Sequence, residues 1–75
     1  MKRKDILQHC IDILYEQLIM AQIDIKAIEE YFKDHGESDN AKYELQEHKA
    51  RNARVIDSLM LKIEMGQKML REEGE

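Results

Sequence analysis

The sequence of 75 residues has no proline, no tryptophan, three glycines and a single cysteine. An average chain is roughly 5% proline, so about four would be expected here, and their absence favours long uninterrupted helices. Three glycines supply too few turns for a β-sandwich. The chain is also too short for a Rossmann domain or for an enzyme pocket walled in by several elements. These absences predict one all-α domain over residues 1–75 that is not an enzyme.

Disulfide pairing, membrane spanning and general nucleic-acid binding are also disfavoured by what the chain lacks. Cys10 has no second cysteine to pair with, which is typical of a reducing cytoplasm. The longest uncharged run, residues 17–23, is far short of the about 20 residues that span a bilayer. Twelve Lys and Arg against sixteen Asp and Glu give a net charge of −4, too acidic for a general nucleic-acid binder. We therefore expect a cytoplasmic protein with no membrane segment and no direct binding to nucleic acid.

Two stripes of apolar residues, one in each half of the chain, have the alternating four- and three-residue spacing of coiled-coil helices. The first stripe is Leu7, Ile11, Leu14, Leu18, Ala21, Ile25, Ile28 and Phe32. The second is Leu45, Ile56, Leu59, Ile63 and Leu70, interrupted at Lys49, Asn52 and Gly66. Between the stripes, Gly36 suits the end of a helix, and Ser38 or Asp39 can cap the next one. The pattern predicts helices over about 3–34 and 39–73, joined by a turn at 35–38 into an antiparallel coiled-coil hairpin.

Folding the hairpin about this turn predicts a register in which the numbers of facing residues add up to 73 or 74. The well-filled pairs are Ile28 with Leu45, Leu18 with Ile56, Leu14 with Leu59, and Ile11 with Ile63. The defective pairs are Ile25 with Lys49, Ala21 with Asn52, and Leu7 with Gly66. We therefore expect a well-packed base and a more polar half near the turn. An asparagine in a coiled-coil seam can fix the register at some cost in stability.

More apolar surface remains than one seam can bury. The residues assigned to a further interface are Ile6, Ile13, Met20 and Ile23 in the first helix, with Val55, Met60 and Met65 in the second. Because an isolated helical hairpin is rarely stable, this surplus predicts a homodimer that forms a four-helix bundle. A docking face for a larger partner, with methionines as adaptable contacts, is the alternative. Cys10, beside this surplus, is expected to be a small buried side chain.

The turn carries the sequence His35-Gly-Glu-Ser-Asp-Asn-Ala-Lys-Tyr43. It resembles the tip of the bacterial Gre transcript-cleavage factors, a Gly-Asp-Leu-Ser-Glu-Asn-Ala-Glu-Tyr type motif on an antiparallel coiled-coil hairpin. Gly36 matches the glycine of that motif, and Glu37 and Asp39 match its two acids. Asn40, Ala41 and Tyr43 match the Asn-Ala-x-Tyr that opens the second helix. One residue is missing between the two acids, and the family's globular second domain has no counterpart in this sequence.

The resemblance implies a protein that enters the secondary channel of RNA polymerase and modulates transcription. Glu37, Asp39, Asn40 and Tyr43 would be its contacts to the polymerase active centre. The two acids would help to hold a Mg²⁺ ion shared with the polymerase, where a water is activated to cleave backtracked RNA. With the shortened turn, the tip could instead block the channel and inhibit.

Two other interpretations of these residues stay open, and a third is disfavoured. The turn can be chemically inert in a non-enzymatic, homo-oligomeric adapter, because helical hairpins often turn through Gly, Ser, Asp and Asn. A modest basic face, His48, Lys49, Arg51 and Arg54, could touch structured RNA, although a solvated helix face explains it as well. A zinc site is disfavoured, because His9 and Cys10 are expected near the base of the hairpin, roughly 40 Å by helix rise from His35 near the tip.

Overall fold

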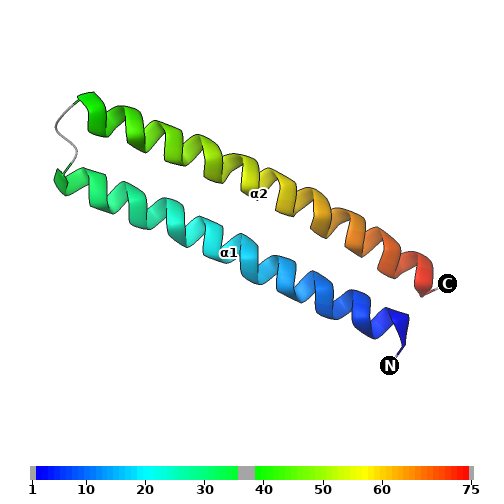
Figure 1. Cartoon of the computed structure of the whole chain (residues 1–75). Helices are drawn as coiled ribbons and strands as arrows, with labels where there is room; N and C mark the ends of the chain where they lie inside the picture. The colour runs from blue at the N-terminus through cyan, green and yellow to red at the C-terminus, as the bar shows by residue number, and fades with distance from the viewer. Residues whose placement is uncertain (1, 36–38, 75) are drawn as a thin grey trace.

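The computed structural model describes residues 2–35 and 39–74, and these residues form two long α-helices. Helix α1 spans Arg3–His35 and helix α2 spans Asp39–Glu73, and the two run antiparallel along their whole length (Figure 1). The molecule is a rod with extents of 56 × 16 × 12 Å. The prediction of an all-helical hairpin is confirmed. The first helix extends through His35, which the sequence had assigned to the turn, and the other turn residues 36–38 lie outside the described residues.

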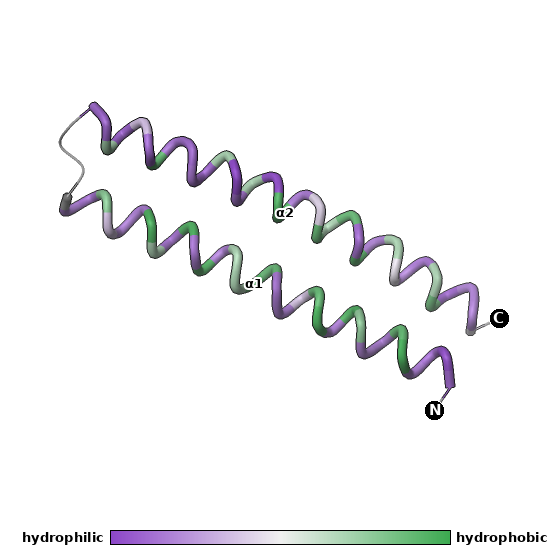
Figure 2. The backbone as a smooth tube through the Cα atoms, in the orientation of Figure 1, coloured by the Kyte–Doolittle hydropathy of each residue, from purple (hydrophilic) through white to green (hydrophobic). Residues whose placement is uncertain are grey.

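The seam between the helices follows the two predicted stripes. Every stripe position except Lys49 is buried or half-buried. The buried residues in the described part of the chain are Ile11, Ala21, Leu59 and Ile63. Ile11, Leu59 and Ile63 lie in the half of the hairpin that holds the chain ends, and Ala21 lies just past the middle of α1. Figure 2 shows α2 mainly hydrophilic in its half nearer the loop, whereas hydrophobic residues recur along α1. The expected well-packed base and more polar tip half are confirmed.

The register of the seam differs from the predicted one. A Cβ atom built on Gly66 would lie 3.0 Å from Ile11 Cγ1, so Gly66 faces Ile11 and not Leu7. Two ion pairs agree with this register: Arg3 Nε to Glu73 Oε1 at 2.9 Å, and Lys49 Nζ to Glu29 Oε1 at 3.3 Å. The numbers of these three pairs add up to between 76 and 78 instead of 73 or 74. The helices are therefore shifted by about one step of the stripe.

The shift has a packing reason at both ends of the rod. The observed register places Phe32 at the level of Leu45 and Leu7 at the level of Leu70, and all four side chains are half-buried. In the predicted register Phe32 faced only the small Ala41, and Leu70 faced Arg3 or Lys4. Half-burial of a Leu or Phe side chain contributes about half of the roughly 1.5–3 kcal/mol that full burial gives, so apolar contacts at both ends favour the observed register. The small Gly66 accommodates Ile11 at close approach.

Cys10 is exposed, which corrects the expectation of a buried thiol. Its position follows from the heptad: Cys10 precedes the buried Ile11 directly, so its side chain points about 100° around the helix from the seam. Within residues 2–35 and 39–74, neither helix has an apolar stretch long enough to cross a membrane.

Candidate functional site

The tip of the rod is the start of α2, where the Gre-like motif enters the described part of the chain. Asp39 and Asn40 are the first two residues of α2, and both are exposed. An acidic side chain in the first turn is favourable because the free amides give a helix N-terminus partial positive charge. Glu37, the other acid of the motif, lies outside the described residues, as do Gly36 and Ser38. The structure thus places Asp39 and Asn40 at the end of the hairpin.

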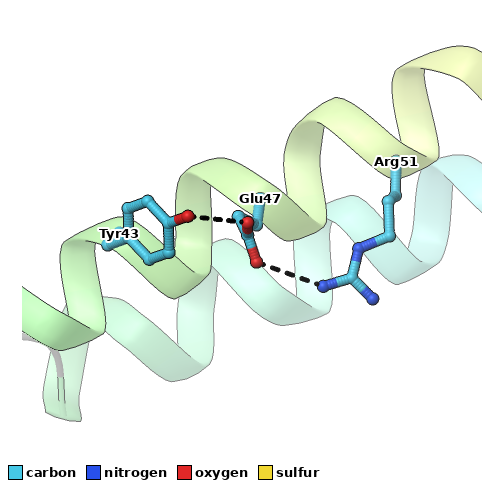
Figure 3. A network of polar contacts seen from close by, with 3 residues as sticks. All are labelled: Tyr43, Glu47 and Arg51. Carbon is cyan, nitrogen blue, oxygen red and sulfur yellow. Dashed lines mark hydrogen bonds and ion pairs between the residues drawn. The ribbon is translucent and has the colours of Figure 1, made fainter.

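Tyr43, the last residue of the motif, belongs to a polar ladder along one side of α2 (Figure 3). The Tyr43 hydroxyl donates a hydrogen bond of 2.9 Å to Glu47 Oε1. The other carboxylate oxygen, Glu47 Oε2, lies 3.5 Å from Arg51 Nη2. Tyr43 is 64% exposed, so it is available to a partner on one side while Glu47 holds its hydroxyl on the other. The four-residue spacing that forms the ladder is the spacing at which helical side chains meet.

The ladder has a measurable electrostatic signature. The Glu47 carboxylate raises the pKa of Tyr43 above its ordinary value, first because it accepts the phenol's hydrogen bond and second because it repels the phenolate. We expect Glu47→Gln to lower the pKa of Tyr43 towards the ordinary value, because the repulsion disappears. An alkaline titration followed by tyrosinate absorbance measures this, with Tyr43→Phe variants in both backgrounds to isolate Tyr43 from Tyr15 and Tyr31. An unchanged Tyr43 titration would show that the ladder does not form in solution.

The basic face proposed for RNA contact is partly neutralised. Lys49 pairs with Glu29 across the helices, and Arg51 pairs with Glu47 along α2. Because two of its cations already face carboxylates, the face is a weak electrostatic attractor for phosphates. Among residues 2–35 and 39–74 no group of three His, Cys, Asp or Glu side chains comes close enough to hold a metal ion.

The residues assigned to a further interface are all exposed, but they occupy more than one side of the hairpin. Met20 and Val55 line a groove of 710 Å³, here called the Met20 groove, which runs between the helices on one side of the seam. Met60 lines a second groove of 460 Å³ beside Tyr15 and Leu18. Gln67 Nε2 donates a hydrogen bond of 3.0 Å to Tyr15 Oη beside this second groove. The seven residues therefore do not form one continuous surface.

Sequence reasoning missed two of the three charged residues that border the Met20 groove, whereas Arg54 was assigned to the basic face. Asp24 borders it on α1, and Arg54 and Lys62 border it on α2. A signal for two of them existed in the sequence. Asp24 follows the seam residue Ala21 by three positions, and Lys62 follows Leu59 by three, which places both immediately beside the seam. Their charges were overlooked because only apolar residues were assigned to interfaces.

Comparison with known proteins adds no functional assignment. No protein-family model, curated protein or solved structure matches this chain. Functional proposals therefore depend on the residues of the hairpin itself.

Proposed function

We propose that the protein is a Gre-like hairpin that binds RNA polymerase in the cytoplasm by entering its secondary channel, and so modulates transcription. The observation that carries the proposal is the position of the motif. Asp39 and Asn40 are exposed at the end of a rod that is 56 Å long and only 16 × 12 Å across. A residue delivered into an active centre owned by another protein has to stand on such a narrow projection.

The acids of the tip suit the role that the resemblance implies. Carboxylate oxygens are the preferred ligands of Mg²⁺, which usually keeps several waters and takes one or two carboxylates. When bound and shared with the polymerase, such an ion would supply the activated water for cleavage of RNA. Asp39, with Glu37, would hold it, while Asn40 and Tyr43 contact the surrounding polymerase. If the shortened turn keeps the acids from reaching the metal, the hairpin still fills the channel and acts as an inhibitor.

The test is co-elution of the purified chain with bacterial RNA polymerase core enzyme, beside the double variant Glu37→Ala/Asp39→Ala. We expect the wild type and the double variant to co-elute with the polymerase equally well, because the two acids serve RNA cleavage and do not contribute to binding. In stalled elongation complexes we expect the wild type to shorten the RNA and the double variant to lose this activity. If the wild type binds the polymerase but does not shorten the RNA, the protein acts by blocking the channel. No co-elution at micromolar concentration would overturn the proposal.

A second candidate function is a non-enzymatic adapter that assembles through its apolar faces, with an inert turn. The observation that favours it is the exposure of large apolar side chains on both helices, including Met20, Ile23, Val55 and Met60. Burying them in a homodimeric four-helix bundle, or against a partner, would add the stability that a lone hairpin lacks. In this case Glu37→Ala/Asp39→Ala leaves assembly unchanged, and no polymerase co-elutes.

A further inference from the structure

The hairpin exposes more surface than a compact protein of its mass. A monomer of 8.9 kDa that follows the usual scaling has about 4,800 Å² of accessible surface, whereas this chain has 6121 Å². The surplus is about 1,300 Å². A standard stable interface buries about 800 Å² on each partner, and obligate homodimers bury more. The surplus is therefore of the size that one homodimer interface would remove.

The Met20 groove is the side of the hairpin best suited to such an interface. Its apolar floor includes Ala21 and Leu59 of the seam, and the exposed Met20 and Val55 stand beside them. The sequence extends this apolar side beyond the groove, because Ile6 and Ile13 precede Met20 at seven-residue intervals, on the same side of α1. The residues beside the groove thus form an apolar strip along the well-packed base half.

The two edges of the Met20 groove carry opposite charges. Asp24 lies on the α1 edge, and Arg54 and Lys62 lie on the α2 edge. In the observed register, Asp24 and Arg54 are at the same level along the rod. A second copy related by a two-fold axis parallel to the helices would place its α2 edge over the first copy's α1 edge at that same level. Asp24 of each copy then faces Arg54 of the other, a self-complementary arrangement of the kind that two-fold interfaces require.

The opposite orientation is electrostatically unfavourable. A two-fold axis perpendicular to the rod would place α2 of one copy over α2 of the other. Around a centre near Ser58, Arg54 of one copy would then face Lys62 of the other, so that like charges meet twice. The second groove is also less suitable, because Asp57 and Glu64 line its α2 side. The Tyr15–Gln67 hydrogen bond already joins the helices beside it.

We propose that a second copy of this chain covers the Met20 groove, in a two-fold dimer whose two tips point the same way. This inference rests on the proposal that the apolar faces mediate assembly, and it commits that proposal to one face, one occupant and one orientation. The polymerase-binding proposal rests instead on the narrow cross-section of a single rod, so it applies to the monomer, and its tip residues Asp39 and Asn40 lie outside the Met20 groove.

Sedimentation equilibrium of the full chain, with circular dichroism as a check of helicity, tests the face. We expect a mass of about 18 kDa, twice that of the single chain. Met20→Glu should raise the dimer dissociation constant more than tenfold, because it buries an unpaired charge at the centre of the interface. Two matched controls on other sides of the hairpin, Ile23→Glu and Met60→Glu, should leave the dissociation constant within about threefold of the wild type.

Charge reversal tests the pairing even if Met20→Glu prevents folding. Asp24→Arg should weaken the dimer severalfold, because it would face Arg54 of the other copy, and Asp24→Arg/Arg54→Asp should restore it. Nitroxide labels on Lys33→Cys in a Cys10→Ser background report the orientation. With tips together the labels should lie about 20–30 Å apart, whereas opposed tips would separate them by about 40 Å along the rod.

The possible results distinguish failure of the proposed dimer face and orientation from failure of the proposal that the apolar faces mediate assembly. A chain that stays monomeric at all concentrations would overturn both. A dimer broken by Met60→Glu or Ile23→Glu but not by Met20→Glu would keep assembly and overturn the choice of face. A label distance near 40 Å, or no rescue by Asp24→Arg/Arg54→Asp, would overturn the parallel orientation.

Discussion

Replacing Leu59 with alanine is expected to lower the free energy of unfolding by about 2–5 kcal/mol. Leu59 is only 5% exposed and belongs to the small buried core of the base half. The variant therefore loses the transfer free energy of the side chain and leaves a cavity that two rigid helices fill poorly. A domain of 75 residues typically has a total free energy of unfolding of about 4–11 kcal/mol. Thermal and urea denaturation followed by circular dichroism should show a large loss, and partial unfolding before denaturant is added.

The chain supplies a control of identical chemistry two residues away. Leu61 is 58% exposed, so Leu61→Ala removes the same atoms from a site where little burial is lost. We expect a change within about 0.5 kcal/mol. Both variants are compared at one protein concentration, because dimerisation would make apparent stability concentration-dependent. Equal losses in Leu59→Ala and Leu61→Ala would mean that the seam of the hairpin is not the one described.

Asn52→Leu is expected to act in the opposite direction and to raise stability by about 1 kcal/mol. Asn52 is a half-buried seam residue that lines the Met20 groove together with Ala21. A leucine there buries apolar surface where a polar amide now lies, and half of a full leucine burial corresponds to this magnitude. The cost is specificity, because a polar residue in a coiled-coil seam disfavours alternative registers.

Two measurements check this prediction. Urea denaturation should give a higher midpoint for Asn52→Leu, and amide NMR spectra should show additional peaks as other registers become populated. Gln46→Leu, at an exposed position of α2, is the control and should change neither quantity. A midpoint for Asn52→Leu at or below the wild type would show that Asn52 makes a favourable polar contact that outweighs the burial.

The helices could be predicted from sequence because their cause is local. An apolar residue every three or four positions, without proline, admits few alternatives, and the described helices follow the stripes from Arg3 to Glu73. The register could not be predicted in the same way, because it depends on the shapes of opposing side chains. Gly66 looked like a defect to be placed under Leu7, whereas the structure uses it to seat Ile11.

The candidate site was predictable only where sequence neighbours decide the geometry. The exposed start of α2 at Asp39 followed from the capping pattern. The Tyr43–Glu47–Arg51 ladder has a regular four-residue spacing that the motif comparison passed over. The position of Asp24 at the same level as Arg54, on opposite edges of the Met20 groove, depends on the register and so could not be predicted without the structure.

The ion pair between Arg3 and Glu73 shows that the start of α1 and the end of α2 lie side by side at the base of the rod. A force that pulls these two ends apart therefore acts across the seam. It separates the facing residues of α1 and α2 one layer after another, from the base towards the tip. The half-buried Leu7 and Leu70 separate first, and the next layers contain Ile11, Ile63 and Leu59, which are the best packed. Resistance to separation is therefore highest within this half of the rod and falls once Asn52 and Lys49 are reached. Under tension we therefore expect the helices to resist separation in the base half of the rod and to separate more easily in the half nearer the tip.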